Sequence, residues 1–514
     1  MLNVNRNMNI KSYDNPPPWH NRHENVIVEN FKRFYDIETP DPRDGTQIIG
    51  DLRLTVEALK GIIADAAKAG QRLRCIGGSW SLSNVVETDG WLINTRGLNL
   101  CLTSISNSYV SENYNVKKDP ASLYFAQCGT SVQELIDILF KDRMTLTTVG
   151  ASNGQTIVGA IATGTHGSAY NYGSMTEYVV GIHLIVSPER DIWLERKSYP
   201  VVSEEFIELM GTELVADDDL FNAVLVSFGS FGIVHGVMIE AEPVYLLEAT
   251  RKRYPFDDKL REAMRTLDFS KIPVDPKNLW HFEIDFNPYD IAGGAYVTTM
   301  YRRPCPLTYQ EQPVPSGQYA IGNGFLSFIG KLSEELSSGS VGWLVNKIFE
   351  MQYKDFTAKL GTPGETFSTT DLMGKAMSME LGVSLENAEK VLDLLVNAKP
   401  EVEVYPGVFS FRYVKRSSAM LGFTKFDNTC TIEFNASYNA RTVDFYNRVW
   451  NDLAKSGIPY TLHWGQMGNY SPALALAMYG ADVIKTWKDA RTTLLDASMQ
   501  KIFSSPFTDQ CGLS

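Results

Sequence analysis

The sequence predicts an α+β fold, mainly because its pattern changes near residue 248. Before that point, helical spacing of apolar residues alternates with short strands, and glycine loops interrupt them at 77–78, 150–167 and 229–232. After it, apolar and polar residues alternate, as in W-H-F-E-I-D-F at 280–286, which is typical of antiparallel strands. The length of 514 residues also allows two or three domains.

The first half carries helix and strand signals in a regular order. Apolar residues recur at helical spacing, glycine follows the end of one helix, and a capping box starts another. The expected elements are a helix around 59–66 ended by Gly70, strands at 72–76 and 123–128, a helix capped by Ser131 and Glu134, and a hairpin of 183–186 with 192–194.

In the second half, a helix is expected at 385–397 and strands at 408–414 and 429–436. Because strand side chains alternate between faces, Arg412 lies on the face of Ser410, away from the aromatic residues around it. If the two strands pair, Arg412 and Glu433 can share one polar surface. A sheet face turned to solvent would give the same pattern.

Helical spacing also runs through 325–352, which fits either packing between domains or contact with a membrane surface or lipophilic substrate. Residues 1–30 are rich in asparagine and charge, so we expect an N-terminal arm. Its histidines, His20 and His23, are expected to be solvated, and we expect no metal site.

The composition argues against several classes of protein. A net charge of −13 disfavours nucleic acid as a partner, because phosphate binding needs clustered lysine and arginine. The six cysteines are scattered without a C-x-x-C pair, which is typical of free thiols in a reducing compartment. We find no signal-peptide pattern and no long apolar run, and therefore expect a cytoplasmic protein without stable membrane insertion.

The stretch from Gly150 to Gly167, G-A-S-N-G-Q-T-I-V-G-A-I-A-T-G-T-H-G, has five glycines and no charged residue. Such a segment is a poor helix former, and its small residues permit close approach of the backbone to a ligand. No G-x-G-x-x-G lies between a strand and a helix, and no P-loop occurs, so a bound phosphate would be held by irregular loops. The missing fingerprint also disfavours an NAD-dependent enzyme.

Five motifs in collinear order resemble FAD-linked oxidases of the vanillyl-alcohol oxidase type, nearest the aldonolactone and alditol oxidase branch. They are I-G-G-S-W-S-L-S at 76–83, G-Q-T-I-V-G-A-I-A-T-G-T-H-G at 154–167, F-G-S-F-G-I-V at 228–234, F-R-Y-V-K at 411–415 and H-W-G-Q at 463–466. The resemblance implies a two-subdomain FAD-binding domain of the PCMH type at 31–248, a substrate (cap) domain at 249–455 containing an antiparallel sheet flanked by helices, and a C-terminal strip at 456–514 that returns to the FAD domain.

The resemblance also implies which residues bind FAD. Backbone N–H groups of the first loop can bind the pyrophosphate as an anion nest. The expected cofactor-binding residues are Ile76, Gly77, Gly78, Ser79, Trp80, Ser81, Gly150, Ala151, Ser152, Gly154, Thr156, Gly159, Ala160, Thr163, Gly164, His166, Gly167, Gly232, Ile233 and Val234. Trp80 stands where many relatives have a histidine joined to the flavin, and 150–153 holds no cysteine, so we expect non-covalent FAD.

The expected catalytic residues are Arg412, Glu433, His463 and Gln466. The resemblance places Arg412 near the flavin, where a fixed cation would stabilise the charge that develops on reduction. Relatives commonly have an acid at the position of Ser410, a histidine at that of Glu433 and a lysine at that of Gln466. Glu433 could orient or deprotonate the substrate hydroxyl, or could only pair with Arg412.

We therefore expect an FAD-dependent oxidoreductase that transfers a hydride from a CH–OH carbon to flavin N5, with O2 or another acceptor reoxidising the flavin. The substrate could be derived from a sugar, or could be a sterol-like or secondary-metabolite alcohol in contact with aromatic cap residues. Those residues are Trp280, Phe282, Phe286, Tyr289, Tyr296 and Tyr301. The alternative is a flavin-binding protein of the same fold with a lyase, transferase or purely binding role.

Overall fold

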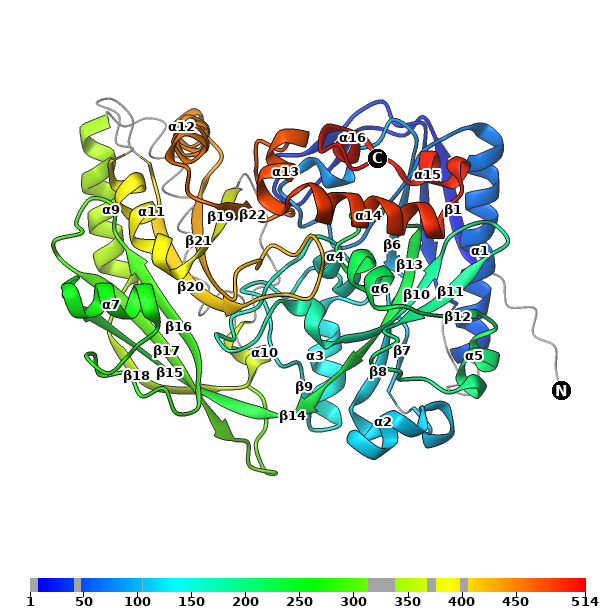
Figure 1. Cartoon of the computed structure of the whole chain (residues 1–514), viewed down its shortest axis with the longest axis horizontal. Coiled ribbons are helices and arrows are strands. Elements are labelled where there is room, and N and C mark those ends of the chain that lie inside the picture. Colours follow the sequence, from blue (N-terminus) through cyan, green and yellow to red (C-terminus); the bar gives the residue numbers. More distant parts are fainter. Residues whose placement is uncertain (1–7, 41–47, 104, 313–337, 368–375, 398–404) are drawn as a thin grey trace.

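The computed structural model describes residues 8–40, 48–103, 105–312, 338–367, 376–397 and 405–514. Within them the chain forms two lobes side by side (Figure 1). The N-terminal lobe contains residues 8–243 and the C-terminal helices, and the middle lobe contains residues 245–462. Helices and strands are mixed in both lobes, so the predicted α+β class is confirmed.

Two sheets build the N-terminal lobe. The four-stranded sheet has the order β1 (Asn9–Asp14), β4 (Arg33–Glu38), β6 (Trp91–Gly97), β5 (Leu73–Ile76). The six-stranded sheet has the order β12 (Glu213–Ala216), β11 (Asp191–Glu195), β10 (Val179–Ile185), β13 (Ile233–Glu240), β8 (Leu123–Gln127), β7 (Cys101–Leu102). Helix α1 (Ile48–Ala69) buries its apolar stripe, and α3 (Val132–Lys141) starts with the predicted capping box of Ser131 and Glu134.

The N-terminal arm that the composition predicts is instead part of this lobe from residue 9 onward. Strand β1 pairs antiparallel with β4, and the short strands β2 (Trp19–His20) and β3 (Ile27–Val28) pair with each other. A few apolar residues among the polar ones fix the segment, because Val26, Val28 and Phe31 are buried. His23, expected to be solvated, is also buried.

The stretch from Gly150 to Gly167 contains a short helix, α4 (Ile157–Ala162), despite its low helix propensity. Thr156 caps this helix by accepting a hydrogen bond from the Gly159 N–H, and Ile157 and Ile161 are buried. Capping and burial therefore outweigh the cost of the glycine.

An eight-stranded antiparallel sheet forms the middle lobe. Its order is β18 (Phe356–Gly361), β15 (Tyr245–Tyr254), β17 (Ala295–Pro304), β16 (Leu279–Phe286), β20 (Val408–Lys415), β21 (Asn428–Ser437), β19 (Ala376–Ser384), β22 (Tyr460–Leu462). One face is apolar and buries residues such as Phe282, Phe411 and Ile432. Strands β20 and β21 pair, which sets Ser410 opposite Glu433.

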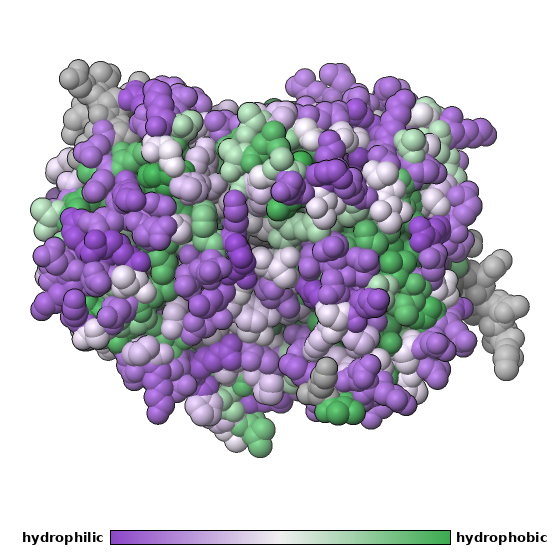
Figure 2. Space-filling model, in the orientation of Figure 1, coloured by the Kyte–Doolittle hydropathy of each residue, from purple (hydrophilic) through white to green (hydrophobic). Residues whose placement is uncertain are grey.

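Helices α7 (Asp258–Thr266), α9 (Ser338–Gln352), α11 (Leu385–Asn397) and α12 (Ala440–Ser456) flank this sheet (Figure 1). Helix α9 confirms the helical spacing for 338–352, and residues 325–337 lie outside the described part. The chain then returns to the N-terminal lobe in α13 (Pro472–Tyr479), α14 (Ala481–Leu494), α15 (Ala497–Phe503) and α16 (Pro506–Gln510). Hydrophilic residues cover much of the face in Figure 2, and no described helix is both long and apolar enough to cross a membrane.

Candidate active site

A cavity of about 400 Å³ lies between the two lobes. The glycine loops of the N-terminal lobe line one side, and the polar face of the middle-lobe sheet lines the other. The apolar face of the sheet lies away from it, and none of the six aromatic residues expected at the substrate lines the cavity. On the middle-lobe side the lining instead combines charged residues with other aromatic ones, which are Tyr353, Phe356 and Phe367.

The loop at 77–81 is shaped as a backbone cradle. A Cβ on Gly77 would lie 2.3 Å from Oγ1 of Thr156, and one on Gly78 would lie 2.7 Å from the Gly154 carbonyl oxygen, so neither position accepts a side chain. Ser79 adopts a left-handed φ of 61°. Within the described residues, the N–H groups of 78–81 donate no hydrogen bond to the chain and remain available to an anion.

Most of the expected cofactor-binding residues line this cavity. They are Ile76, Gly77, Gly78, Ser79, Trp80, Ser81, Gly150, Ala151, Ser152, Thr156, Gly159, Ala160, Thr163, His166, Gly232, Ile233 and Val234. Three do not line it. Gly154 leaves room for the Trp80 ring, Gly167 leaves room for Thr148, and Gly164 has a left-handed φ of 70°.

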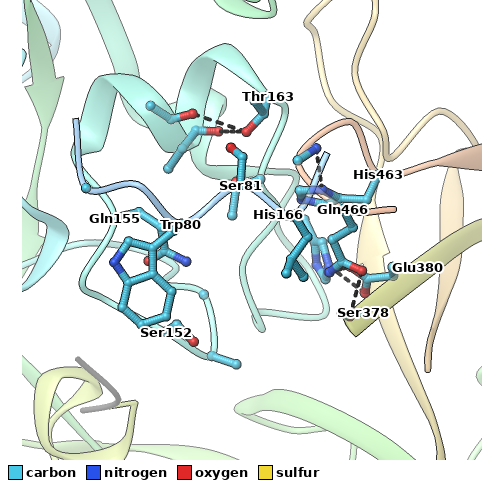
Figure 3. Close-up of a pocket in the computed structure, with 18 of the residues that line it drawn as sticks. Trp80, Ser81, Ser152, Gln155, Thr163, His166, Ser378, Glu380, His463 and Gln466 are labelled. Atoms are coloured by element: carbon cyan, nitrogen blue, oxygen red, sulfur yellow. Dashed lines mark hydrogen bonds and ion pairs between the residues drawn. The ribbon is translucent and has the colours of Figure 1, made fainter. Parts of the chain in front are cut away.

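The Trp80 ring lies against Gly154. Figure 3 shows it beside Ser152 and Gln155. Its ring is in edge contact with His23, at 5.7 Å between centroids, and the Arg22 guanidinium lies 5.4 Å from its centre. The indole Nε1 is buried without a hydrogen-bond partner in the described part of the chain. Such a donor beside the cavity fits a ligand that supplies an acceptor.

Residues 21–25, here called the N-terminal clasp, hold the 78–82 loop from outside. Four hydrogen bonds run from Arg22 N to Ser79 O (3.0 Å), from Arg22 Nε to Gly78 O (3.1 Å), from Asn21 Nδ2 to Ser81 O (2.9 Å) and from Asn25 Nδ2 to Leu82 O (2.8 Å). Burial and the neighbouring Arg22 lower the pKa of His23 to about 4, so this ring is neutral at neutral pH.

Glu380 is the centre of the polar cluster opposite the loops. It is 1% exposed and accepts hydrogen bonds from His166 Nε2 (2.8 Å), Arg412 Nη2 (3.1 Å) and Gln466 Nε2 (3.2 Å). Figure 3 shows Glu380 beside His166 and Gln466. Burial alone would raise its pKa, but the charges of His166 and Arg412 outweigh burial and hold the pKa of Glu380 well below its usual range. Glu380 was not among the residues predicted from the sequence, although M-S-M-E at 377–380 alternates as a strand.

Arg412 joins Glu380 to Glu433. The same Nη2 that binds Glu380 lies 2.5 Å from Oε2 of Glu433, and both carboxylates line the cavity. Burial raises the pKa of Glu433 despite the attraction of Arg412. Arg412 therefore binds two acids with different properties. Glu380 stays ionised and provides a fixed negative charge, whereas Glu433, with its raised pKa, is able to take up a proton.

Two histidines complete the cluster, and their hydrogen bonds decide their roles. Nδ1 of His463 accepts from the Gly465 N–H (3.1 Å), and burial lowers the pKa of His463 to about 4, so its Nε2 carries the proton and can donate. Nδ1 of His166 faces the Gly167 carbonyl at 2.8 Å and must donate to it. Nε2 of His166 lies 2.8 Å from Oε1 of Glu380, so the ring connects the Gly167 carbonyl to the carboxylate.

Strand β16 carries two further acids that were not predicted from the sequence, and one of them, Glu283, lines the cavity. His281 holds Glu283 at 3.3 Å, and burial is outweighed by this bond and by nearby charges, so the pKa of Glu283 falls to about 2. Burial, together with the charge of Glu283, raises the pKa of Asp285 to about 8. Ser410 donates to Asp285 Oδ1 at 2.6 Å. The alternation in W-H-F-E-I-D-F places these acids on one face and is the signal that could have found them.

Comparisons with known proteins agree with this geometry. A family model described as an FAD binding domain matches residues 54–189. L-gulono-1,4-lactone dehydrogenase of Mycobacterium tuberculosis is 25% identical over 436 residues, which are 83% of this chain and 88% of that protein. A long-chain alcohol oxidase from an uncultured marine euryarchaeote is 31% identical over 200 residues, or 39% of this chain and 33% of that protein.

A solved structure, cholesterol oxidase from B. sterolicum, covers 98% of this chain and 97% of its own at a TM-score of 0.68 and 12% identity. At this identity the likeness concerns the fold. The expected fold, an FAD-binding domain joined to an antiparallel sheet with helices, is confirmed.

Proposed function

We infer that this chain, which belongs to the FAD-linked oxidases of the vanillyl-alcohol oxidase superfamily and is an FAD-dependent oxidoreductase, oxidises a CH–OH carbon of a small molecule inside the cavity between its lobes. The observation that carries this inference is the position of the Arg412 cluster, which faces the glycine-lined cradle across one cavity. The relatives are named oxidases and dehydrogenases, so the alternative of a lyase, transferase or purely binding role is not favoured.

The cradle fits FAD, and we propose that FAD binds without a covalent bond. Free backbone N–H groups at 78–81 suit the pyrophosphate, and the unpaired Nε1 of Trp80 suits an acceptor on the cofactor. Indole cannot form the bond that a histidine forms at this position in many relatives. The four hydrogen bonds of the N-terminal clasp hold the loop instead.

Bound FAD supplies the hydride acceptor. In the proposed step the substrate C–H hydrogen leaves with its electron pair, the hydroxyl proton passes to Glu433, and a C=O bond forms. A raised pKa suits Glu433 as this base. Arg412 orients the oxygen and Glu380 positions Arg412, while His463 presents an N–H donor and Gln466 fixes Glu380. The other role for Glu433 is charge balance for Arg412 alone.

Replacing Glu433→Gln tests the base, because glutamine keeps an acceptor for Arg412 and loses the proton site. Anaerobic mixing with an alcohol substrate should show the rate of flavin reduction fall by about a hundredfold or more, with little change in substrate affinity. The control is Glu248→Gln on strand β15. This change removes a carboxylate that pairs with Arg303 and does not line the cavity. Equal rates of flavin reduction in the Glu433 variant and the wild type would exclude Glu433 as the base and would leave charge balance for Arg412 as its role.

We further propose the domain limits 31–248 with 456–514 for the FAD domain and 249–455 for the cap. Strand β15 begins before residue 249 and strand β22 lies after residue 455, although both pair within the middle-lobe sheet. The acceptor is O2 or another oxidant, since the relatives include both an oxidase and a dehydrogenase. Turnover with O2 or with a dye under argon distinguishes them.

A further inference from the structure

We propose that Arg251 forms an anion subsite of the cavity, and that the substrate carries a carboxylate as well as the hydroxyl group that is oxidised. The inference that the substrate has a hydroxyl group rests on the proposed function. The inference that it has a carboxylate rests on the arrangement of the middle-lobe sheet and on the surroundings of the buried Arg251 guanidinium group.

Arg251 lies in a row of side chains that crosses the sheet. The antiparallel registers set Phe356, Arg251, Thr298, Glu283 and Arg412 opposite one another on successive strands. Directly opposite residues face the same side of a sheet, and all of these residues line the cavity. At a strand spacing of about 4.8 Å, the three spacings between Arg251 and Arg412 amount to about 14 Å.

The Arg251 side chain is buried and held in place, yet incompletely paired. It is 9% exposed, its Nε donates to Thr298 Oγ1 at 2.9 Å, and its guanidinium carbon lies 5.1 Å and 5.4 Å from the ring centres of Tyr353 and Phe356. Among the residues that the structure describes, neither Nη group has a hydrogen-bond acceptor, and no carboxylate lies within ion-pair distance. The charge of Glu283 attracts Arg251 from beyond ion-pair distance. A buried cation without a direct ion pair is costly, and a ligand anion in the cavity would offset that cost.

Arg412, at the other end of the row, is already matched by Glu380 and Glu433. The two arginines therefore differ in their ion pairs: among the described residues Arg412 has two carboxylates within ion-pair distance and Arg251 has none, although the Nε of Arg412 is also without a hydrogen-bond partner. Between them lies Glu283, which is ionised and bonded by His281. A ligand with a double negative charge would be repelled by Glu283, so the subsite favours a single charge.

A carboxylate fits these conditions better than a phosphate. The planar fork of a guanidinium group binds a carboxylate through two parallel hydrogen bonds, and both Nη groups of Arg251 are free for it. Since both arginine side chains can lean into the space between them, the hydroxyl and the carboxylate of the substrate would be separated by on the order of 10 Å. The structure thus favours a hydroxy acid of intermediate length over a sterol or a short 2-hydroxy acid.

The test uses the FAD-loaded enzyme under anaerobic conditions and calorimetric titration with three probes. These are ω-hydroxydecanoate, its methyl ester and decanediol, which differ mainly in the charge at one end. The variants are Arg251→Gln and Arg251→Lys. The control is Arg253→Gln, which removes a cation from the same strand, where it pairs with Asp290 at 3.1 Å and does not line the cavity.

We expect the wild type and the Arg253 variant to bind the carboxylate about ten- to a hundredfold more tightly than the ester, the size expected for a charged hydrogen bond. Arg251→Gln should abolish this preference while FAD content stays unchanged, and Arg251→Lys should keep part of it. An equal preference in wild type and Arg251→Gln, or none in the wild type, overturns the subsite. Absence of flavin bleaching by any alcohol would contradict the proposed oxidation instead, because the calorimetric preference does not depend on turnover.

Discussion

Replacing Glu380→Gln should lower the free energy of unfolding by about 3 kcal/mol, because three hydrogen bonds to a buried charge become bonds to a neutral amide at about 1 kcal/mol each. The donors are His166, Arg412 and Gln466. Urea unfolding at neutral pH measures the loss. The control is Glu386→Gln at an exposed position on α11, which should change stability by about 0.5 kcal/mol or less.

The pH dependence gives a second measurement on the same variant. The pKa of Glu380 is depressed in the folded protein, so its contribution is present above its unfolded pKa and is lost as pH falls toward the folded value. Wild type should therefore lose more stability than Glu380→Gln on acidification below about pH 4.5. A variant that loses less than about 1 kcal/mol at neutral pH, with an unchanged acid slope, would refute the view that Glu380 is the ionised anchor of the cluster.

Three further outcomes concern the cofactor. Acid precipitation should leave the flavin in the supernatant, because Trp80 cannot hold it covalently, and flavin in the pellet would contradict this. Arg22→Ala should weaken FAD binding by about tenfold, since the side-chain hydrogen bond to Gly78 O and the guanidinium contact with the Trp80 ring are lost, as measured by flavin fluorescence against a Lys11→Ala control outside the clasp. The lowered pKa of His23 disfavours its charged form in the folded protein. The clasp should therefore lose stability, by up to about 3 kcal/mol, as pH falls from about 6.5 to about 4, and FAD affinity should fall with it. His23→Phe should remove this pH dependence of FAD affinity.

Local patterns in the sequence predict much of the site. Alternation along β20 and β21 sets Arg412 and Glu433 on one face, and their bond at 2.5 Å follows once the strands pair. The same rule applied to β16 would have placed Glu283 and Asp285 beside them. The cradle glycines, such as Gly77, were also predictable from this single sequence, because a Cβ at these positions would clash with neighbouring atoms.

Long-range strand order decides the remainder and is not readable from local pattern. Glu380 reaches Arg412 because β19 follows β21 in the sheet, and Arg251 joins the same row because β15 and β17 follow β16 on the other side. The N-terminal clasp depends on contacts across about sixty residues of sequence. The composition of residues 1–30 predicted an arm, because polar residues outnumber the few apolar residues that are buried.

Asp285 shows how the chain keeps an acid where the resemblance predicts one. The resemblance implies an acid at the position of Ser410. Here Ser410 lies opposite Asp285 in the sheet register and donates to it at 2.6 Å. The carboxyl group thus comes from the neighbouring strand, and because burial and Glu283 raise its pKa to about 8, it is uncharged at neutral pH. An uncharged acid leaves the positive charge of Arg251 available to a ligand.

Asp285→Asn tests this protonation state directly. A carboxyl group whose pKa is raised on folding stabilises the fold at low pH, and that contribution is lost as pH rises from the unfolded pKa near 3.8 toward about 8. Over this range the stability of the wild type should fall relative to that of Asp285→Asn by about 1.4 kcal/mol per pH unit. Asparagine keeps an acceptor for Ser410, so the variant should fold and bind FAD. Parallel stability curves for the two proteins between pH 5 and pH 8 would mean that Asp285 is ionised, and the Arg251 charge would then be balanced within the protein.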